Sequence, residues 1–341
     1  MSKIQKLLSG RHDDKIEYAQ IIEKHPWIVE KRHKAILSPD SDGLLCGLLM
    51  SHYLDWTIEG FYDGKVMLLK KGVDPKDCIF LDMEIARAEI RSVGHHMLLL
   101  NRNSKPTDWE AKFKNCIQPN NLRGYDGKHD FRLKYPLATI HMLMCILNEK
   151  EKILLKEESI PPLYFTDGVF NVLFKYPENV LNWLNFLDSQ KKENPLNPIF
   201  ENEKYTTIIN LMKEMDAFFR LRDAMSIPYE RGDRLKISSK DGQPFNVEES
   251  NNSYKINDAA VERILKFLEL LSSSTGWGLK KQSWAWSNLK LFKFTKGSFE
   301  KDGKTLTKQN FKDFWEKNPL SWAMTSGANI EYTLEGPDTL A

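Results

Sequence analysis

Short apolar runs alternate with longer segments of helical character through the first half of the chain. The runs at residues 35–37, 66–69 and 78–81 are contiguously apolar, a pattern that is typical of strands buried on both faces of a parallel sheet. The apolar segment 44–54 is long enough to form a helix between the first two runs. This alternation predicts an α/β fold, with a mostly parallel sheet flanked by helices.

The remaining pattern predicts a second, smaller domain. Residues 189–203 combine Lys, Glu and Asn with two prolines and indicate a linker. We therefore predict one domain at residues 1–190, which includes an N-terminal helical extension, and an α+β domain at residues 204–341. Further helices are predicted at residues 1–30, 84–91, 135–147, 178–187, 205–225 and 258–271, and further strands at 92–96, 289–294 and 330–334.

Composition restricts the class of protein. The chain has 341 residues, of which 41% are hydrophobic, enough for a sizeable core or two. No apolar run reaches the roughly 18 residues of a membrane span, and the first residues lack the apolar run of a signal peptide. The four cysteines form no CxxC pair, so we expect a reducing, cytoplasmic location. A net charge of +2 is too balanced to predict a general nucleic-acid coat.

Acidic and histidine side chains follow the predicted strands. Asp40 and Asp42 follow the first strand, Asp82 follows the third, and His95 and His96 end the strand at 92–96. Because ligands bind at the carboxyl ends of parallel strands, we expect these side chains to lie together. Carboxylates suit Mg²⁺ and Mn²⁺, and imidazole suits transition metals. Any one of the aspartates could instead cap a helix, so the prediction depends on their joint placement.

Four motifs, in this order, resemble those of the DHH phosphoesterase superfamily. They are Pro39-Asp40-Ser41-Asp42-Gly43, Asp82 after its strand, Gly94-His95-His96, and Thr166-Asp167-Gly168. The resemblance covers roughly residues 35–170. The family includes single-strand-specific exonucleases, phosphodiesterases of nano-RNA and cyclic dinucleotides, and manganese pyrophosphatases.

The resemblance implies a role for each motif residue. Asp82 would bridge two metal positions, and His96 would face the substrate phosphate as a charge stabiliser or acid. A metal-activated water would then hydrolyse a phosphodiester bond. The implied ligands of one or two Mn²⁺ or Mg²⁺ ions are Asp40, Asp42, Asp82, His95 and Asp167. In the second domain, Ser326 and Gly327 form a candidate anion-binding loop.

Two positions depart from the family pattern. The family often has a His three residues before the proline of its first motif, where this chain has Ile36. Gly94 replaces the Asp of Asp-His-His, which removes a carboxylate that would orient the site. Two interpretations remain open: a working site with one weaker metal position, or a site that binds without turnover.

Three functions fit this pattern. The first is a metal-dependent phosphoesterase that acts on single-stranded or short nucleic acid. For such a substrate, Trp284 and Trp286 could stack on bases, although tryptophans also dominate cores. The second is a phosphodiesterase for small nucleotides or cyclic dinucleotides, which the balanced charge favours. The third is a binding protein with a degenerate DHH-like site.

Overall fold

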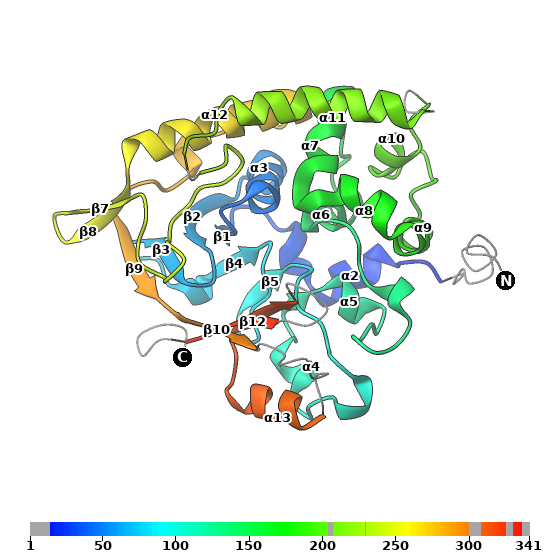
Figure 1. Ribbon diagram of the computed structural model, residues 1–341, viewed down its shortest axis with the longest axis horizontal. Helices are drawn as coiled ribbons and strands as arrows, with labels where there is room; N and C mark the ends of the chain where they lie inside the picture. The colour runs from blue at the N-terminus through cyan, green and yellow to red at the C-terminus, as the bar shows by residue number, and fades with distance from the viewer. Residues whose placement is uncertain (1–13, 204–206, 229, 300–307, 325–329, 336–341) are drawn as a thin grey trace.

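The computed structural model describes residues 14–203, 207–228, 230–299, 308–324 and 330–335. Its centre is a nine-stranded mixed sheet (Figure 1). The strands are β1 (Lys34–Leu37), β2 (Thr57–Tyr62), β3 (Val66–Lys70), β4 (Cys78–Leu81), β5 (Arg91–Val93), β6 (Cys116–Ile117), β7 (Val247–Ser250), β8 (Ser253–Ile256) and β9 (Leu289–Lys293). Their order is β6-β5-β4-β1-β2-β3-β9-β8-β7.

The type of strand pairing changes once across this sheet, from parallel to antiparallel. The pairings from β6 through β5, β4 and β1 to β2 are parallel, and those from β2 through β3, β9 and β8 to β7 are antiparallel. In β1, Ala35, Ile36 and Leu37 are fully buried, as their contiguous apolar sequence predicted. The predicted α/β class is confirmed, and the parallel arrangement holds for the five strands around β1.

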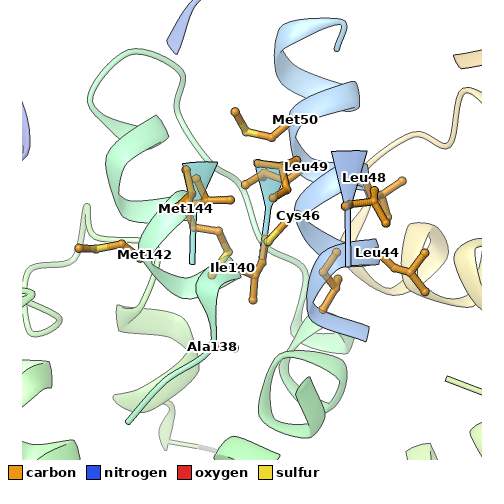
Figure 2. Packing of buried hydrophobic residues seen from close by; sticks show 14 of the residues in the cluster. Leu44, Cys46, Leu48, Leu49, Met50, Ala138, Ile140, Met142 and Met144 are labelled. Atoms are coloured by element: carbon orange, nitrogen blue, oxygen red, sulfur yellow. The ribbon is translucent and has the colours of Figure 1, made fainter. Parts of the chain in front are cut away.

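Two buried helices pack together over the parallel strands. Helix α3 (Ser41–Leu54) and helix α6 (Thr139–Asn148) are in contact, with Cys46 and Leu49 facing Ile140 and Met144 (Figure 2). The chain also contains helices α2 (Tyr18–Lys24), α4 (Trp109–Lys112), α5 (Pro119–Leu122), α7 (Ile160–Phe165), α8 (Val169–Lys175), α9 (Pro177–Phe186), α10 (Asn197–Phe200), α11 (Ile208–Asp223) and α12 (Asp258–Thr275). Within the described ranges, every helix is too short or too polar to traverse a lipid bilayer.

A small antiparallel sheet lies apart from the main one. It contains β10 (Thr295–Phe299), β12 (Ile330–Leu334) and β11 (Ser321–Met324), in that order across the sheet. Along the chain, helix α13 (Lys308–Glu316) lies between β10 and β11. Its aromatic core joins the two halves of the chain. The ring of Trp109 stacks on Trp315 at 5.4 Å and meets Trp322 edge-on at 5.8 Å.

Some predicted elements are wrong. Residues 84–91 form no helix: the backbone N–H of Ala86 donates to the carbonyl of Leu320, and that of Ile85 to the Ser92 hydroxyl. Hydrogen bonds to other segments of the chain therefore override the local helix propensity of residues 84–91. The helix predicted from residue 135 begins instead at Thr139. Strand 66–69 is confirmed as β3, but it is antiparallel to its neighbours.

The predicted linker is part of the packed structure. Residues 189–203 include α10, and Leu196 and Ile199 are buried. Strands from both sides of this segment also pair in the main sheet, since β9 lies between β3 and β8. The predicted domain boundary itself stays a prediction.

Candidate metal centre

The chain leaving β1 enters α3 through a close contact that needs glycine. Asp40 is the N-cap of α3, and its Oδ1 accepts a hydrogen bond from the Gly43 N–H at 3.4 Å. A Cβ on Gly43 would lie 2.0 Å from the carbonyl oxygen of Ser38. The first turn of α3 therefore packs directly on the end of β1 and fixes the positions of Asp40 and Asp42.

Asp42 joins α3 to the N-terminus of α6. The side chain is fully buried, and its two oxygens accept the backbone N–H groups of Thr139 at 2.7 Å and Ile140 at 3.0 Å. These N–H groups have no partner within a helix, and they favour negative charge. Asp42 Oδ2 lies 3.9 Å from His95 Nδ1. Asp42 thus fixes the N-terminus of α6 through two hydrogen bonds and places a carboxylate near His95.

Asp82 directly follows β4 in a left-handed backbone conformation, with φ of 59°, which Asp and Asn tolerate better than most residues. Its Oδ1 accepts the Thr139 hydroxyl at 2.8 Å. Its Oδ2 is buried and accepts no hydrogen bond from any described residue. A buried carboxylate oxygen without a partner is costly, so this atom is suited to a cation.

His95 is held between Thr139 and Asp167. Its Nδ1 lies 2.8 Å from the Thr139 hydroxyl oxygen, and its Nε2 lies 3.2 Å from Asp167 Oδ2. When Asp82 is ionised, the Thr139 hydroxyl donates to it and accepts from His95 Nδ1–H. The unprotonated Nε2 of a neutral His95 then faces the Asp167 carboxylate, an arrangement that a cation between the two atoms satisfies.

Four side chains each offer a ligand atom within 4.8 Å of the others: Asp82, His95, His96 and Asp167. We call this set the acid–histidine cluster. It brings together residues from the ends of β4 and β5 and from the turn between α7 and α8. Asp42 borders the cluster. Asp40 lies at its rim, where its Oδ2 is 3.8 Å from the Arg234 guanidinium.

Electrostatics in the cluster favour a cation. Burial raises the pKa of Asp42, and burial together with the Asp42 and Asp40 charges raises the pKa values of Asp82 and Asp167 well above their usual range. Burial, together with nearby cationic side chains, lowers the pKa of His95 well below its usual value. A bound divalent cation would lower the pKa values of these carboxyl groups, because it stabilises ionised carboxylates, and it would bind the neutral imidazole of His95.

Sequence reasoning missed Glu84. This side chain is buried, and its Oε1 accepts the Met97 N–H at 2.9 Å. Its Oε2 lies 3.6 Å from His96 Nδ1 and only 2.7 Å from where a Cβ on Gly94 would be. A carboxylate is therefore present beside Gly94, but it comes from the segment that the sequence predicted as a helix. Burial lowers the pKa of His96, whereas the nearby Glu84 carboxylate raises it, to about 9.

Other predicted residues lie away from the cluster. Ile36 is fully buried, in an apolar group that includes Tyr62 and Phe80. Trp284 is also buried, and it stacks on Trp286 at 5.9 Å, which favours its core-packing interpretation. Ser326 and Gly327 lie outside the described residues.

Two cavities meet at the cluster. The larger, of about 580 Å³, is lined by Asp40, Asp82, Glu84 and His96 and by residues of the C-terminal half. The smaller, of about 210 Å³, is lined by His95, His96 and Asp167 and by Lys134 and Tyr176. His96 borders both, so a ligand in either cavity reaches the cluster.

Comparison of the chain with protein-family models, with curated proteins and with solved structures gave no match. The chemistry of the site is therefore inferred from its own donor set. Carboxylate oxygens and imidazole nitrogens close to one another, together with one buried carboxylate oxygen that accepts no hydrogen bond from a described residue, fit a divalent ion such as Mn²⁺, which accepts both ligand types.

Proposed function

We propose that the protein is a DHH-like, metal-dependent phosphoesterase that hydrolyses phosphodiester bonds in single-stranded or short nucleic acid. The observation that carries this proposal is the acid–histidine cluster, with four ligand atoms within 4.8 Å. The cluster lies at the carboxyl ends of parallel strands, where α/β folds bind ligands, and beside a cavity of about 580 Å³. Mn²⁺ or Mg²⁺ is the cofactor that we propose.

Each residue of the cluster has a task in this proposal. Asp82, His95 and Asp167 hold the ion, and Thr139 orients both Asp82 and His95 through its hydroxyl. A bound divalent ion would withdraw charge from a phosphoryl oxygen and favour deprotonation of water. His96 lines the cavity; in the metal-free protein burial lowers its pKa and Glu84 raises it, to about 9, so we assign it the role of an imidazolium and not that of a metal ligand. It stabilises phosphoryl charge and can give its proton to the leaving oxygen.

Hydrolysis of a small nucleotide or cyclic dinucleotide is a second candidate function. The volume of the larger cavity, about 580 Å³, lies within the range of about 300–1,000 Å³ that is common for small-molecule sites. Substrate length preference separates the two candidates. A linear oligonucleotide, long or short, that is cleaved better than a mononucleotide or a cyclic dinucleotide favours the first, and the reverse favours the second.

The proposal is tested by Mn²⁺-dependent cleavage of end-labelled single strands with wild-type protein and Asp82→Asn. Asparagine tolerates the left-handed backbone and still accepts from Thr139, so the change removes mainly the charge. We expect activity to fall by about a thousandfold. Asp216→Asn, on the exposed face of α11, is the matched control and should keep full activity. Cleavage that survives Asp82→Asn would place the active site elsewhere.

The stability of the Asp82→Asn variant provides a second test of the proposal. A carboxyl whose pKa is raised by folding destabilises the folded state at pH values above its unfolded pKa. At neutral pH and without metal, Asp82→Asn should therefore be more stable than wild type by about 1–2 kcal/mol. Mn²⁺ should raise the Tm of wild type and not that of the variant. If Mn²⁺ stabilises wild type but no phosphodiester is cleaved, the protein is a metal-binding protein without this activity.

A further inference from the structure

Part of the wall of the larger cavity, at residues 235–239, is fixed to the loop and turn at the ends of β1 and β2. The backbone N–H of Leu235 donates to the carbonyl of Pro39 at 2.7 Å. The Ser238 hydroxyl bonds to Asp63, and Lys65 Nζ donates to the carbonyl of Ser239 at 2.6 Å. These contacts join the segment before β7 both to the loop that carries Asp40 and to the turn between β2 and β3. The wall therefore has a defined position relative to the cluster.

This wall is rich in cations. Its basic members, which we call the cationic wall, are Lys65, Arg231, Arg234, Lys236, Lys240 and Lys296. Two of these ammonium groups contact neutral partners: Lys65 bonds to a backbone carbonyl, and Lys236 lies 4.3 Å from the centre of the Phe245 ring. Their charge is therefore available to an anion in the cavity.

The carboxylates of the same wall have other partners. Glu230 pairs with Arg263, and Glu331 pairs with Lys296 at 2.5 Å. Asp63 accepts the backbone N–H groups of Lys65 and Val66 as well as the Ser238 hydroxyl. The charges of Glu230 and Glu331 are thus compensated by ion pairs, whereas the ammonium groups of Lys65 and Lys236 contact neutral partners.

Arg234 connects the cationic wall to the metal centre. Its guanidinium lies 3.8 Å from Asp40 Oδ2, and about half of its side chain is exposed, at 49%. Guanidinium groups bind phosphate through paired N–H donors. The lining of one cavity therefore brings Lys65, Lys236 and Arg234 together with Asp82 and His96 of the acid–histidine cluster.

We propose that the cationic wall binds phosphates other than the one that is hydrolysed, so the substrate carries at least two phosphates. This requirement excludes a substrate whose only phosphate is the one that reacts, and it admits linear oligonucleotides as well as cyclic dinucleotides, bound through the backbone. This inference rests on the proposed function, because the cluster must hold the phosphate that reacts. Contacts to phosphate are independent of sequence, and the wall therefore selects for chain length and charge rather than for bases.

Equilibrium binding tests the proposal without turnover. In an Asp82→Asn background, the anisotropy of a labelled single-stranded oligonucleotide is measured against salt concentration. Lys65→Met and Lys236→Met keep the aliphatic stem and remove the charge. We expect each change to reduce the steepness of the log–log salt dependence by about 0.7, the value for one lost phosphate contact on a single strand. Lys213→Met, on the exposed surface of α11, is the control and should leave the slope unchanged.

Turnover separates this inference from the proposed function. The Lys65→Met/Lys236→Met protein is compared with wild type on the oligonucleotide and on bis(p-nitrophenyl) phosphate, which has one phosphate. We expect kcat/KM to fall about tenfold more for the oligonucleotide than for the small diester. Equal losses, or an unchanged salt slope, would overturn the inference. If wild type cleaves neither substrate, the proposed function fails, and the binding measurement still decides whether the wall binds phosphates.

Discussion

His96 lies beside two carboxylates that have different roles. Glu84 Oε1 is fixed by the Met97 N–H, which leaves Oε2 at 3.6 Å from His96 Nδ1. Asp82 Oδ1 is 4.0 Å from the same nitrogen and is already bonded to Thr139. Only glycine at position 94 leaves room for the Glu84 carboxylate. The Glu84 carboxylate, which comes from the connection between β4 and β5, therefore lies beside His96 in space that a side chain at position 94 would occupy.

Glu84→Gln should lower the pKa of His96 toward its ordinary value of 6.5. In wild type, the raised pKa of about 9 stabilises the metal-free folded state below pH 6.5, and this contribution is lost as pH rises through about 9. Because 35% of the His96 side chain is exposed, solvent screening reduces the contribution to about 1 kcal/mol. Urea unfolding below and above this window measures it in chelator-treated protein.

The comparison needs a matched acid that is remote from His96. Glu110→Gln removes a largely exposed carboxylate that pairs with Lys105, and its pH dependence should follow that of wild type. Glu84→Gln should instead lose less stability across the window than wild type does. The same loss in all three proteins would show that Glu84 does not set the charge of His96.

At the residue scale, the sequence predicts the site residues that lie at the ends of strands. It does not predict the site residues that are positioned by tertiary packing. Asp82 follows a predicted strand, His95 and His96 end another, and Asp167 belongs to a motif of the family resemblance. The structure brings their ligand atoms within 4.8 Å of one another; their roles as ligands stay predictions. Glu84 and Thr139 contribute through contacts that no local pattern encodes. Thr139 depends on where α6 begins, and Glu84 depends on a segment that is held in place by Leu320.

The most constrained element of the site is the start of α3. Its N-cap Asp40 and first-turn Asp42 come from one short segment, and Gly43 lets that segment contact Ser38. The sequence predicts this helix because its apolar run is long. It does not predict β2, whose run is interrupted by Glu59 and Gly60. A Cβ on Gly60 would lie 2.3 Å from the carbonyl oxygen of Leu68, so close strand packing, rather than apolar patterning, explains that glycine.

Gly43→Ala should therefore disturb both stability and metal binding. The added methyl group would overlap the Ser38 carbonyl, and we expect a loss of about 2–3 kcal/mol in the free energy of unfolding. Displacement of Asp40 and Asp42 should also weaken Mn²⁺ binding, as measured by calorimetric titration. Gly278→Ala is the control, because its Cβ would be at an ordinary 3.5 Å from His52 Nδ1; it should cost about 0.5 kcal/mol or less. Equal stability of the two variants would contradict this account.

At the scale of the whole molecule, the main sheet joins distant parts of the chain. Strand β9 pairs with β3 along its whole length, from Leu289 opposite Lys70 to Lys293 opposite Val66. Helix α12 contacts α3, and its buried Phe267 and Leu268 belong to the same apolar core as Leu44 and Leu48. The sequence predicts β9 and α12 as elements, but their assignment to a second domain came from the composition of residues 189–203, which carries no information about strand pairing.

These contacts predict how an isolated N-terminal fragment behaves. A chain of residues 1–203 would leave β3 as an unpaired edge and expose the apolar face of α3 that α12 covers, and both features favour aggregation. We expect this fragment to lack cooperative thermal unfolding, monitored by circular dichroism, and to regain it when residues 204–341 are co-expressed. Full-length protein should unfold in one transition. A fragment that is soluble and unfolds cooperatively alone would instead support an independent domain that ends near residue 190, with β9 and α12 added to a core that is already stable.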